Sequence, residues 1–245
     1  METSPASARP LAIITGGSRG LGYEVAKSLA SRGFDLALIA KDPQRLEAAA
    51  SQLASTGAHI STFACDLEQS HLVRQTIDSI NQSLPTPTVL VLAHGVMSEK
   101  MSKTLKTNDA EWRRVMAINL DSVFQLVNGI APAMADARNG RLVIFSACLG
   151  RMSGPGNAGG LAPYRISKAG VNALVRNLAH ETGLGARGFL VDATCPNHSR
   201  TDMGGPDAPR SAEEGAATAI WLATREFNAG DVSGVLWEDQ QIVPW

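Results

Sequence analysis

The 245-residue sequence is poor in the features that mark several classes of protein. Aromatic residues make up only 5% of it and its net charge is -1, which argues against a partner that is a nucleic acid or an anionic membrane. The three cysteines lack the spacing of a zinc site, so we predict reduced thiols, no metal and a cytoplasmic protein. Met1–Pro10 lacks the apolar core of a secretory signal, and residues 1–9 are expected to be flexible.

Short apolar runs alternate with helical patterns over residues 1–245, which we interpret as one domain. The predicted strands are Leu11–Thr15, Phe34–Ala40, His59–Cys65, Thr88–Ala93, Arg141–Ser146, Gly188–Thr194 and Ser233–Glu238. The predicted helices are Arg19–Ser31, one opening after Asp42-Pro43, Gln69–Gln82, Asp109–Met134, Tyr164–Thr182 and Ser211–Ala223. Strands that are apolar throughout belong in a sheet covered on both faces. The pattern predicts an α/β fold of the Rossmann type, a doubly wound parallel sheet of about seven strands flanked by helices.

A glycine-rich turn, Thr15-Gly16-Gly17-Ser18-Arg19-Gly20-Leu21-Gly22, follows the first strand and opens the first helix. Backbone N–H groups at a helix N-terminus attract phosphate, and glycines let the backbone approach it closely. The turn therefore predicts a dinucleotide site, although a tight turn with a purely structural role has the same appearance.

The end of the second strand indicates which dinucleotide binds. NAD enzymes usually carry an acidic residue there, whereas this chain has Ala40 followed by Lys41, with Arg19 nearby in the glycine turn. Two cations suit a 2′-phosphate, so we predict NADP(H); the alternative is that both are solvated surface charges. Asp42 is expected to cap the next helix. Asp66 and Leu67, after the third strand, either hold the adenine edge or begin the following helix.

Tyr164 and Lys168 lie four residues apart in a predicted helix, so their side chains share one face. A free phenol has a pKa of about 10, and a neighbouring cation favours the phenolate. This pair predicts acid–base chemistry on a substrate beside a nicotinamide. The alternative is an ordinary amphipathic helix with a lysine that reaches to solvent.

The glycine turn, Asp66-Leu67, Asn119 and Tyr164-x-x-x-Lys168 together resemble the short-chain dehydrogenase/reductases, and the segment from Arg200 resembles their carbonyl-reductase-like subgroup. The resemblance implies that Tyr164 donates or accepts the proton, that Lys168 contacts the nicotinamide ribose and that Asn119 joins a water-linked proton path. It also implies a homotetramer or homodimer. The cofactor-binding residues expected are Gly16, Ser18, Arg19, Gly20, Leu21, Lys41, Asp66, Leu67, Ala93, His94, Gly95, Tyr164, Lys168, Pro196, Asn197 and Thr201.

The sequence departs from the family pattern where the catalytic serine is expected. Aligning the strand before Gly150 places Ala147, which has no hydroxyl, at that position. Three explanations stay open: Ser146 or Ser153 replaces the serine, the enzyme works more slowly without one, or the reaction is not ordinary carbonyl reduction.

Further departures flank the same site. The family's Asn-Asn-Ala-Gly is here Leu92-Ala93-His94-Gly95, so Ala93 cannot tie neighbouring strands together as the second asparagine does. We interpret His94 as a packing or capping residue, with a titratable group beside the cofactor as the alternative. Asn197 replaces a glycine and is expected to adopt positive φ, while His198 is expected to be an exposed loop residue.

These observations favour an NADPH-dependent enzyme that reduces a ketone or related carbonyl, with a small-molecule carbonyl or alcohol as substrate. One alternative is altered chemistry, namely imine reduction, alcohol oxidation or a non-redox acid–base step. Another is a non-catalytic protein that binds NADP(H).

Overall fold

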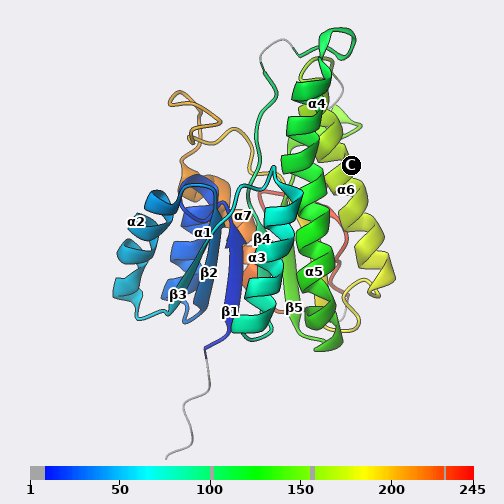
Figure 1. The fold of residues 1–245 in the computed structure, drawn as a ribbon. Coiled ribbons are helices and arrows are strands. Elements are labelled where there is room, and N and C mark those ends of the chain that lie inside the picture. The colour runs from blue at the N-terminus through cyan, green and yellow to red at the C-terminus, as the bar shows by residue number, and fades with distance from the viewer. Residues whose placement is uncertain (1–8, 100–101, 155–157, 229) are drawn as a thin grey trace, which may run out of the picture.

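An eight-stranded sheet lies at the centre of the computed structural model, which describes residues 9–99, 102–154, 158–228 and 230–245 (Figure 1). The strands are β1 Leu11–Thr15, β2 Asp35–Ala40, β3 Ile60–Ala64, β4 Val89–Leu92, β5 Gly140–Phe145, β6 Phe189–Thr194, β7 Leu236–Glu238 and β8 Gln241–Val243. Their order is β3-β2-β1-β4-β5-β6-β7-β8, parallel except for β8, which pairs antiparallel with β7. The predicted doubly wound sheet is thus confirmed, and β4 lies beside β1 because the chain crosses over after β3.

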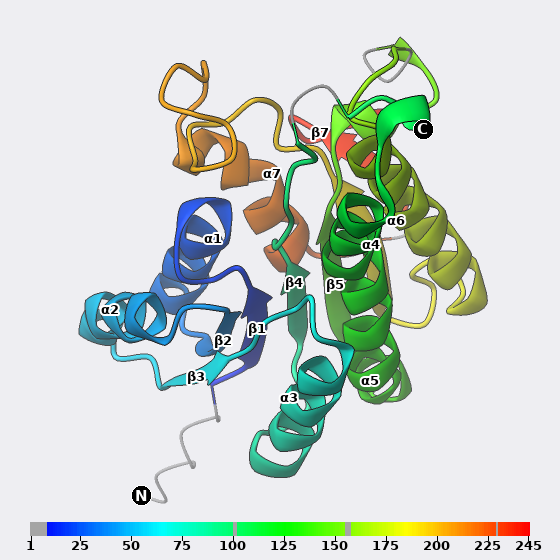
Figure 2. The ribbon, with the colours of Figure 1, turned by 45° about the horizontal axis from the view of Figure 1, so that its top comes forward.

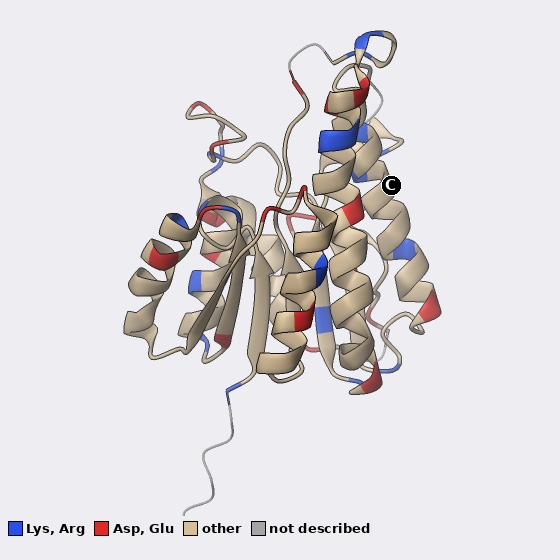
Figure 3. Ribbon diagram, in the orientation of Figure 1, with Lys and Arg blue, Asp and Glu red and all other residues tan. Residues whose placement is uncertain are grey.

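Helices cover both faces of the sheet (Figure 2). They are α1 Gly20–Ser31, α2 Pro43–Leu53, α3 Ser70–Ser83, α4 Asp109–Met116, α5 Ser122–Asp136, α6 Ala162–Glu181 and α7 Ala212–Thr224, with 3-10 turns at Ala54–Thr56, Thr104–Lys106 and Cys148–Gly150. Within the described residues, no helix combines the length and apolarity needed to cross a membrane. Basic and acidic residues are interspersed along the described helices and loops (Figure 3).

Two apolar layers explain why the strands are apolar throughout. One layer joins the sheet to α3, α5 and α6, and the other joins it to α1, α2 and α7. Along β1, Ile13 belongs to the first layer while Ala12 and Ile14 belong to the second. All three are fully buried, because successive side chains of a strand point to opposite faces.

The structure differs from the predicted elements at two places. The helix predicted over Asp109–Met134 is interrupted by a π-helical segment, Ala117–Asp121, which places Asn119 inside the protein. Near the C-terminus the chain reverses at Asp239 and Gln240, both with positive φ, and forms β8. The sequence did not predict β8, since three residues are too few for a pattern of alternation.

At the N-terminus, the guanidinium of Arg9 donates hydrogen bonds to the carbonyls of Gly33 and Gly57, at 3.1 and 2.9 Å. Arg9 is therefore fixed, in contrast to the predicted flexibility; the rest of that predicted segment, residues 1–8, lies outside the described residues. The predicted cap on α2 is confirmed, because Asp42 accepts the N–H of Arg45 at 3.1 Å.

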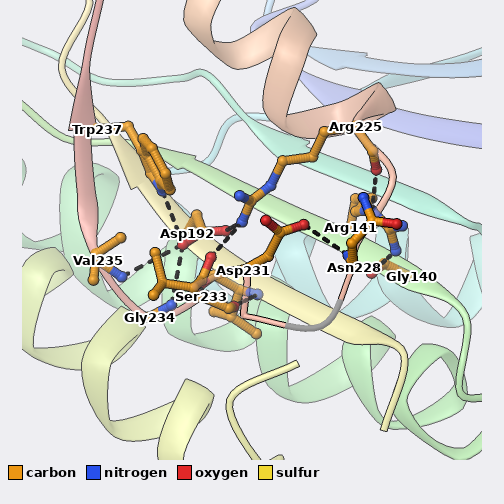
Figure 4. A network of polar contacts seen from close by, with 12 residues as sticks. Gly140, Arg141, Asp192, Arg225, Asn228, Asp231, Ser233, Gly234, Val235 and Trp237 are labelled. Carbon is orange, nitrogen blue, oxygen red and sulfur yellow. Dashed lines mark hydrogen bonds and ion pairs between the residues drawn. The ribbon is translucent and has the colours of Figure 1, made fainter. Parts of the chain in front are cut away.

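A buried ion pair joins β6 to the end of α7 (Figure 4). Arg225 Nη2 lies 2.7 Å from Asp192 Oδ2, and the Trp237 indole donates to Asp192 Oδ1 at 3.1 Å. The guanidinium also lies over the rings of Trp221 and Trp237, with its Cζ 5.1 and 5.0 Å from the two ring centroids. These contacts pair the two buried charges, although Arg225 Nε has no hydrogen-bond partner among the described residues. The cluster links β7 to β6 through Trp237 and Asp192.

Candidate active site

A cleft of about 810 Å³ opens at the carboxyl ends of β1, β2 and β4, where a doubly wound sheet binds its ligand. We call it the cofactor cleft. Its lining includes these residues predicted to bind cofactor: Gly16, Ser18, Arg19, Gly20, Leu21, Lys41, Asp66, Leu67, Ala93, His94, Gly95 and Thr201. The other predicted cofactor residues, Tyr164, Lys168, Pro196 and Asn197, lie outside this lining.

The glycine turn has room for a ligand and none for side chains. Gly16 has φ of +66°, and a Cβ on Gly22 would lie 2.4 Å from the Gly16 carbonyl oxygen. Arg19, at the N-cap of α1, makes no side-chain cap, so the first-turn N–H groups are left for another acceptor. This cradle fits the phosphates of a dinucleotide.

Three cations stand at the outer end of the cofactor cleft, and each has a carboxylate partner. Lys41 Nζ lies 2.7 Å from Asp66, whose hydrogen bond and charge raise the pKa of Lys41. Arg19 forms a close ion pair with Asp202, and Arg45 Nη1 lies 3.6 Å from the same carboxylate. We predicted that Lys41 and Arg19 stand at this end of the cleft without a carboxylate. The structure corrects that prediction, because each of the two is paired with an aspartate.

Sequence reasoning missed both Arg45 and Asp202 in this group. The position of Arg45 in the first turn of α2, three residues after its cap, could have indicated it. Asp202 comes from the loop after β6, and nothing in its local sequence points to β2. The alternative role of Asp66 as a helix cap is wrong, because α3 begins only at Ser70 with Gln69 at its N-cap.

Tyr164 and Lys168 share one face of α6, as predicted. Lys168 Nζ lies 6.0 Å from the Tyr164 ring centroid and donates a hydrogen bond of 2.7 Å to the carbonyl of Phe145. It also lies 3.5 Å from the Cβ position of Gly95, which lines the cofactor cleft. Lys168 thus connects the buried phenol to the inner end of that cleft.

Burial dominates the protonation of this pair. It lowers the pKa of Lys168 to about 8. It also raises the pKa of Tyr164 above its usual range, with the nearby thiols of Cys195 and Cys148 adding to the effect. The expectation that Lys168 would favour the phenolate is therefore wrong for this arrangement, because desolvation outweighs the distant ammonium. Tyr164 therefore carries its proton, although its raised pKa makes it a weaker acid than a free phenol.

Asn119 is fully buried and fully hydrogen-bonded. Its Oδ1 accepts the N–H of Val96 at 2.8 Å, and its Nδ2 donates to the Val96 carbonyl and to Ser167 Oγ, at 2.9 and 3.1 Å. The side chain thus joins the loop after β4 to α6, one residue before Lys168. Single π-helical turns recur at functional sites, and this one aims Asn119 inward. Its place in a proton path stays a prediction.

The hydroxyls of Ser146 and Ser153, the two candidate replacements for the catalytic serine, are each engaged with a residue other than Tyr164. The Ser146 hydroxyl lies 2.5 Å from Asn172 Oδ1, and Ser153 Oγ donates to the carbonyl of Trp245 at 3.1 Å. Ala147 is buried and has no hydroxyl. Asn172 was not predicted, although it lies four residues beyond Lys168 on the same face of α6.

His94 makes the hydrogen bond between the ends of neighbouring strands that Ala93 cannot make. Its Nδ1 lies 2.6 Å from Thr15 Oγ1 and its Nε2 lies 2.9 Å from Ser122 Oγ. Ser122 donates its own proton to the carbonyl of Ile118, so Nε2 must donate and Nδ1 must accept. Burial, then the charge of Lys168, lowers the pKa of His94 to about 3. The packing interpretation is supported, and the histidine is neutral.

The loop after β6 approaches the cofactor cleft from the other side. Asn197 has φ of +57°, as predicted for a residue that replaces glycine. Thr201 packs 3.2 Å from the Cβ position of Gly20, while the exposed His198 ring bonds to the Gly204 carbonyl within the loop. The loop therefore borders the cofactor cleft beside the glycine turn.

The sequence from residue 10 to 211 matches the family model described as short chain dehydrogenase. Relatives include a 3-oxoacyl-acyl-carrier-protein reductase, FabG, of Pseudomonas aeruginosa, which is 31% identical over 204 residues that cover 82% of this chain and 79% of the relative. The chain belongs to the short-chain dehydrogenase family.

Solved structures share the fold. A blue fluorescent protein from a metagenomic library, in complex with NADPH, superposes with a TM-score of 0.82 at 23% identity, over 94% of this chain and 96% of that one. Carveol dehydrogenase from Mycobacterium avium, in complex with NAD, gives 0.82 at 24% identity, over 95% and 96%. These similarities establish the architecture, and both kinds of nicotinamide cofactor occur within it.

Proposed function

We propose that the protein is an NADPH-dependent reductase that converts a ketone or related carbonyl into an alcohol. The observation that carries the proposal is the buried, protonated phenol of Tyr164 beside Lys168, whose Nζ lies 3.5 Å from the Cβ position of Gly95 in the lining of the cofactor cleft. The similarity to a 3-oxoacyl reductase supports a ketone as the substrate class. The bound cofactor supplies the hydride, and the protein supplies the proton.

The residues divide by position within the cofactor cleft. The backbone of Gly16, Ser18, Gly20 and Leu21 would hold the pyrophosphate, and Arg19, Lys41 and Arg45 the 2′-phosphate. Asp66 and Leu67 would hold the adenine, and Ala93, His94 and Gly95 the central part of the cofactor. Thr201 in the cleft, with Lys168, Pro196 and Asn197 outside its lining, would contact the nicotinamide and its ribose.

The preference for NADPH over NADH tests whether the cations at the outer end of the cofactor cleft bind the 2′-phosphate. We expect Arg19→Ala/Lys41→Ala to weaken NADPH binding roughly 10-fold or more, because charge-assisted hydrogen bonds contribute about 1.5–3 kcal/mol each. NADH binding should change little. Fluorescence titration measures both, and Arg176→Ala, an exposed cation on α6, is the matched control. Equal affinity of the unaltered protein for NADPH and NADH would contradict the preference.

The proton would pass from Tyr164 to the carbonyl oxygen as the alcohol forms. Lys168 holds the region electropositive when charged, and Asn119 would belong to the path that returns a proton. Because Ala147 lacks the hydroxyl that would contact the same oxygen, we expect slow turnover: one such donor is typically worth about 2.7–4 kcal/mol.

The missing hydroxyl also favours a second candidate, altered chemistry at the same site, such as imine reduction, alcohol oxidation or a non-redox acid–base step. Ala147→Ser separates the candidates. A large gain in turnover of simple ketones would support a weakened ordinary reductase. No gain would support a repurposed site, and tight NADPH binding without turnover on any carbonyl or imine would indicate a non-catalytic binding protein.

We further propose a cytoplasmic homotetramer or homodimer assembled through the helices predicted over Asp109–Met134 and Tyr164–Thr182, which are α4, α5 and α6 in the structure. A groove of about 810 Å³ between α3 and α5 exposes apolar surface, and the Phe124 side chain on it is 53% exposed. Phe124→Asp should shift the assembly toward the monomer in sedimentation analysis. An unaltered protein that sediments as a monomer would contradict this part.

A further inference from the structure

Two thiols lie side by side where β5 and β6 end. Cys195 follows β6 directly, and Cys148 follows the neighbouring β5, whose Phe145 pairs with Thr194. The backbone N–H of Cys148 donates to Cys195 Sγ at 3.0 Å. Since a backbone nitrogen lies about 1.5 Å from its own Cα, the Cα of Cys148 is within about 4.5 Å of the Cys195 sulfur.

The two thiols differ in reactivity. Cys195 is 2% exposed, whereas Cys148 is half-buried and is the one that a small solute reaches first. The interaction between the two thiols lowers the pKa of Cys148 to about 6 and raises that of Cys195. Cys148 is thus suited to be the attacking thiolate and Cys195 the resolving thiol. The third cysteine, Cys65, follows β3 and is buried in a different part of the sheet.

We propose that Cys148 and Cys195 form an oxidation site at which a peroxide converts the dithiol into a disulfide. The Cys148 thiolate attacks the peroxide O–O bond, which breaks to give a sulfenic acid and, for hydrogen peroxide, hydroxide that is protonated to water. The Cys195 sulfur then displaces the sulfenic oxygen as a second water, and the S–S bond forms. Overall the dithiol loses two electrons and two protons, and the peroxide gains them.

The disulfide would act on the loops that border the substrate. Cys148 follows Ala147, the position without a serine, and Cys195 precedes Pro196 and Asn197 on the nicotinamide side. The Cys195 sulfur accepts a hydrogen bond from the N–H group of Cys148, and formation of the S–S bond would replace this contact. Oxidation should therefore shift both loops near Tyr164 and lower turnover, an effect that rests on the proposed function.

The test treats the reduced full-length protein with increasing hydrogen peroxide and follows its thiols and peptides by mass spectrometry. We expect the loss of two of the three free thiols, a peptide that links Cys148 to Cys195, and recovery with dithiothreitol. Cys65→Ser should retain the linked peptide, and Cys195→Ser should leave Cys148 as a sulfenic acid that dimedone traps. Oxidation of Cys65 before the pair, or separate oxygen adducts on Cys148 and Cys195 without a linked peptide, would overturn the proposal.

Turnover is measured on the same samples. Reversible loss in the unaltered protein and in Cys65→Ser, but not in Cys195→Ser, would support the effect on the site. Full activity of the disulfide form would overturn that effect. The linked peptide is read without substrate or cofactor, so its detection in a protein with no turnover would leave the oxidation site standing while the carbonyl reductase proposal failed.

Discussion

The two halves of the site are built on different principles. The cofactor half, residues 16–22 with Lys41 and Asp66, offers backbone N–H groups, free space and exposed charges. The substrate half surrounds Ala147 and Tyr164 and reaches His94 at its boundary with the cofactor cleft. Its side chains are buried, and His94 lies within hydrogen-bond distance of Thr15 and Ser122. The first half keeps the family pattern and the second departs from it.

This difference shows which changes a site tolerates. Phosphate binding by backbone groups depends on glycine positions, so the cofactor half leaves little room for substitution. In the substrate half, a tie lost at Ala93 is supplied one residue later by His94, with Thr15 and Ser122 as partners. In a buried hydrogen-bond network, one side chain can replace another as long as every buried polar group keeps a hydrogen-bond partner.

The largest effect is expected from Tyr164→Phe, which removes the proposed proton donor. Turnover should fall roughly 100- to 10,000-fold, the usual contribution of a general acid, while NADPH binding stays unchanged. Steady-state kinetics and fluorescence titration measure the two. The control is Tyr23→Phe, since Tyr23 is the second of two tyrosines and its hydroxyl donates to Gln52 on the exposed surface. Equal activity of both variants would remove Tyr164 from the chemistry.

In the cofactor half, Gly22→Ala tests whether cofactor binding requires the close backbone packing of the glycine turn. The new Cβ would lie 2.4 Å from the Gly16 oxygen, so the turn must shift. We expect about 1–3 kcal/mol of lost stability, together with loss of NADPH binding. Gly159→Ala, where a Cβ has nothing within 4 Å, should change neither, as denaturant unfolding and titration would show. Normal cofactor binding by Gly22→Ala would argue against the backbone cradle.

His94→Ala should cost about 1–3 kcal/mol of unfolding free energy, because it leaves buried partners of its hydrogen bonds unsatisfied. The double variant Ala93→Asn/His94→Ala restores the asparagine of the family pattern and should recover much of that loss. Chemical denaturation of the three proteins measures this. If the double variant is no more stable than His94→Ala, an asparagine at position 93 does not replace the hydrogen bonds of His94, and the proposed exchange between the two positions is wrong.

The smallest effect on stability is expected from Lys168→Met, which should stabilise the protein by roughly 1 kcal/mol at neutral pH. Burial lowers the pKa of Lys168 from 10.5 to about 8, so its charged form destabilises the fold fully below pH 8. The advantage of the variant should shrink as pH rises from about 8 toward 10.5. Melting temperatures across this range, with the exposed Lys103→Met as control, would reveal it; a constant difference would contradict the assignment.

Much of the fold and the cofactor half could be predicted because their signals are local. Apolar strands, the glycine turn and the i, i+4 pair of Tyr164 and Lys168 are each read within a few residues. The remainder depends on contacts between distant segments. Asp202 meets Arg19 from the loop after β6, and Asn172 engages Ser146 from α6. The protonation of Tyr164 also follows from burial, which spacing alone does not reveal.

A crystal structure of the complex with NADP⁺ tests the account most directly, because it locates the Tyr164 hydroxyl relative to the nicotinamide. We predict that this hydroxyl and Lys168 Nζ both face the nicotinamide ribose, with the 2′-phosphate among Arg19, Lys41 and Arg45. A nicotinamide bound away from Tyr164, with the phenol still enclosed beside Cys148 and Cys195, would contradict the proposed reaction.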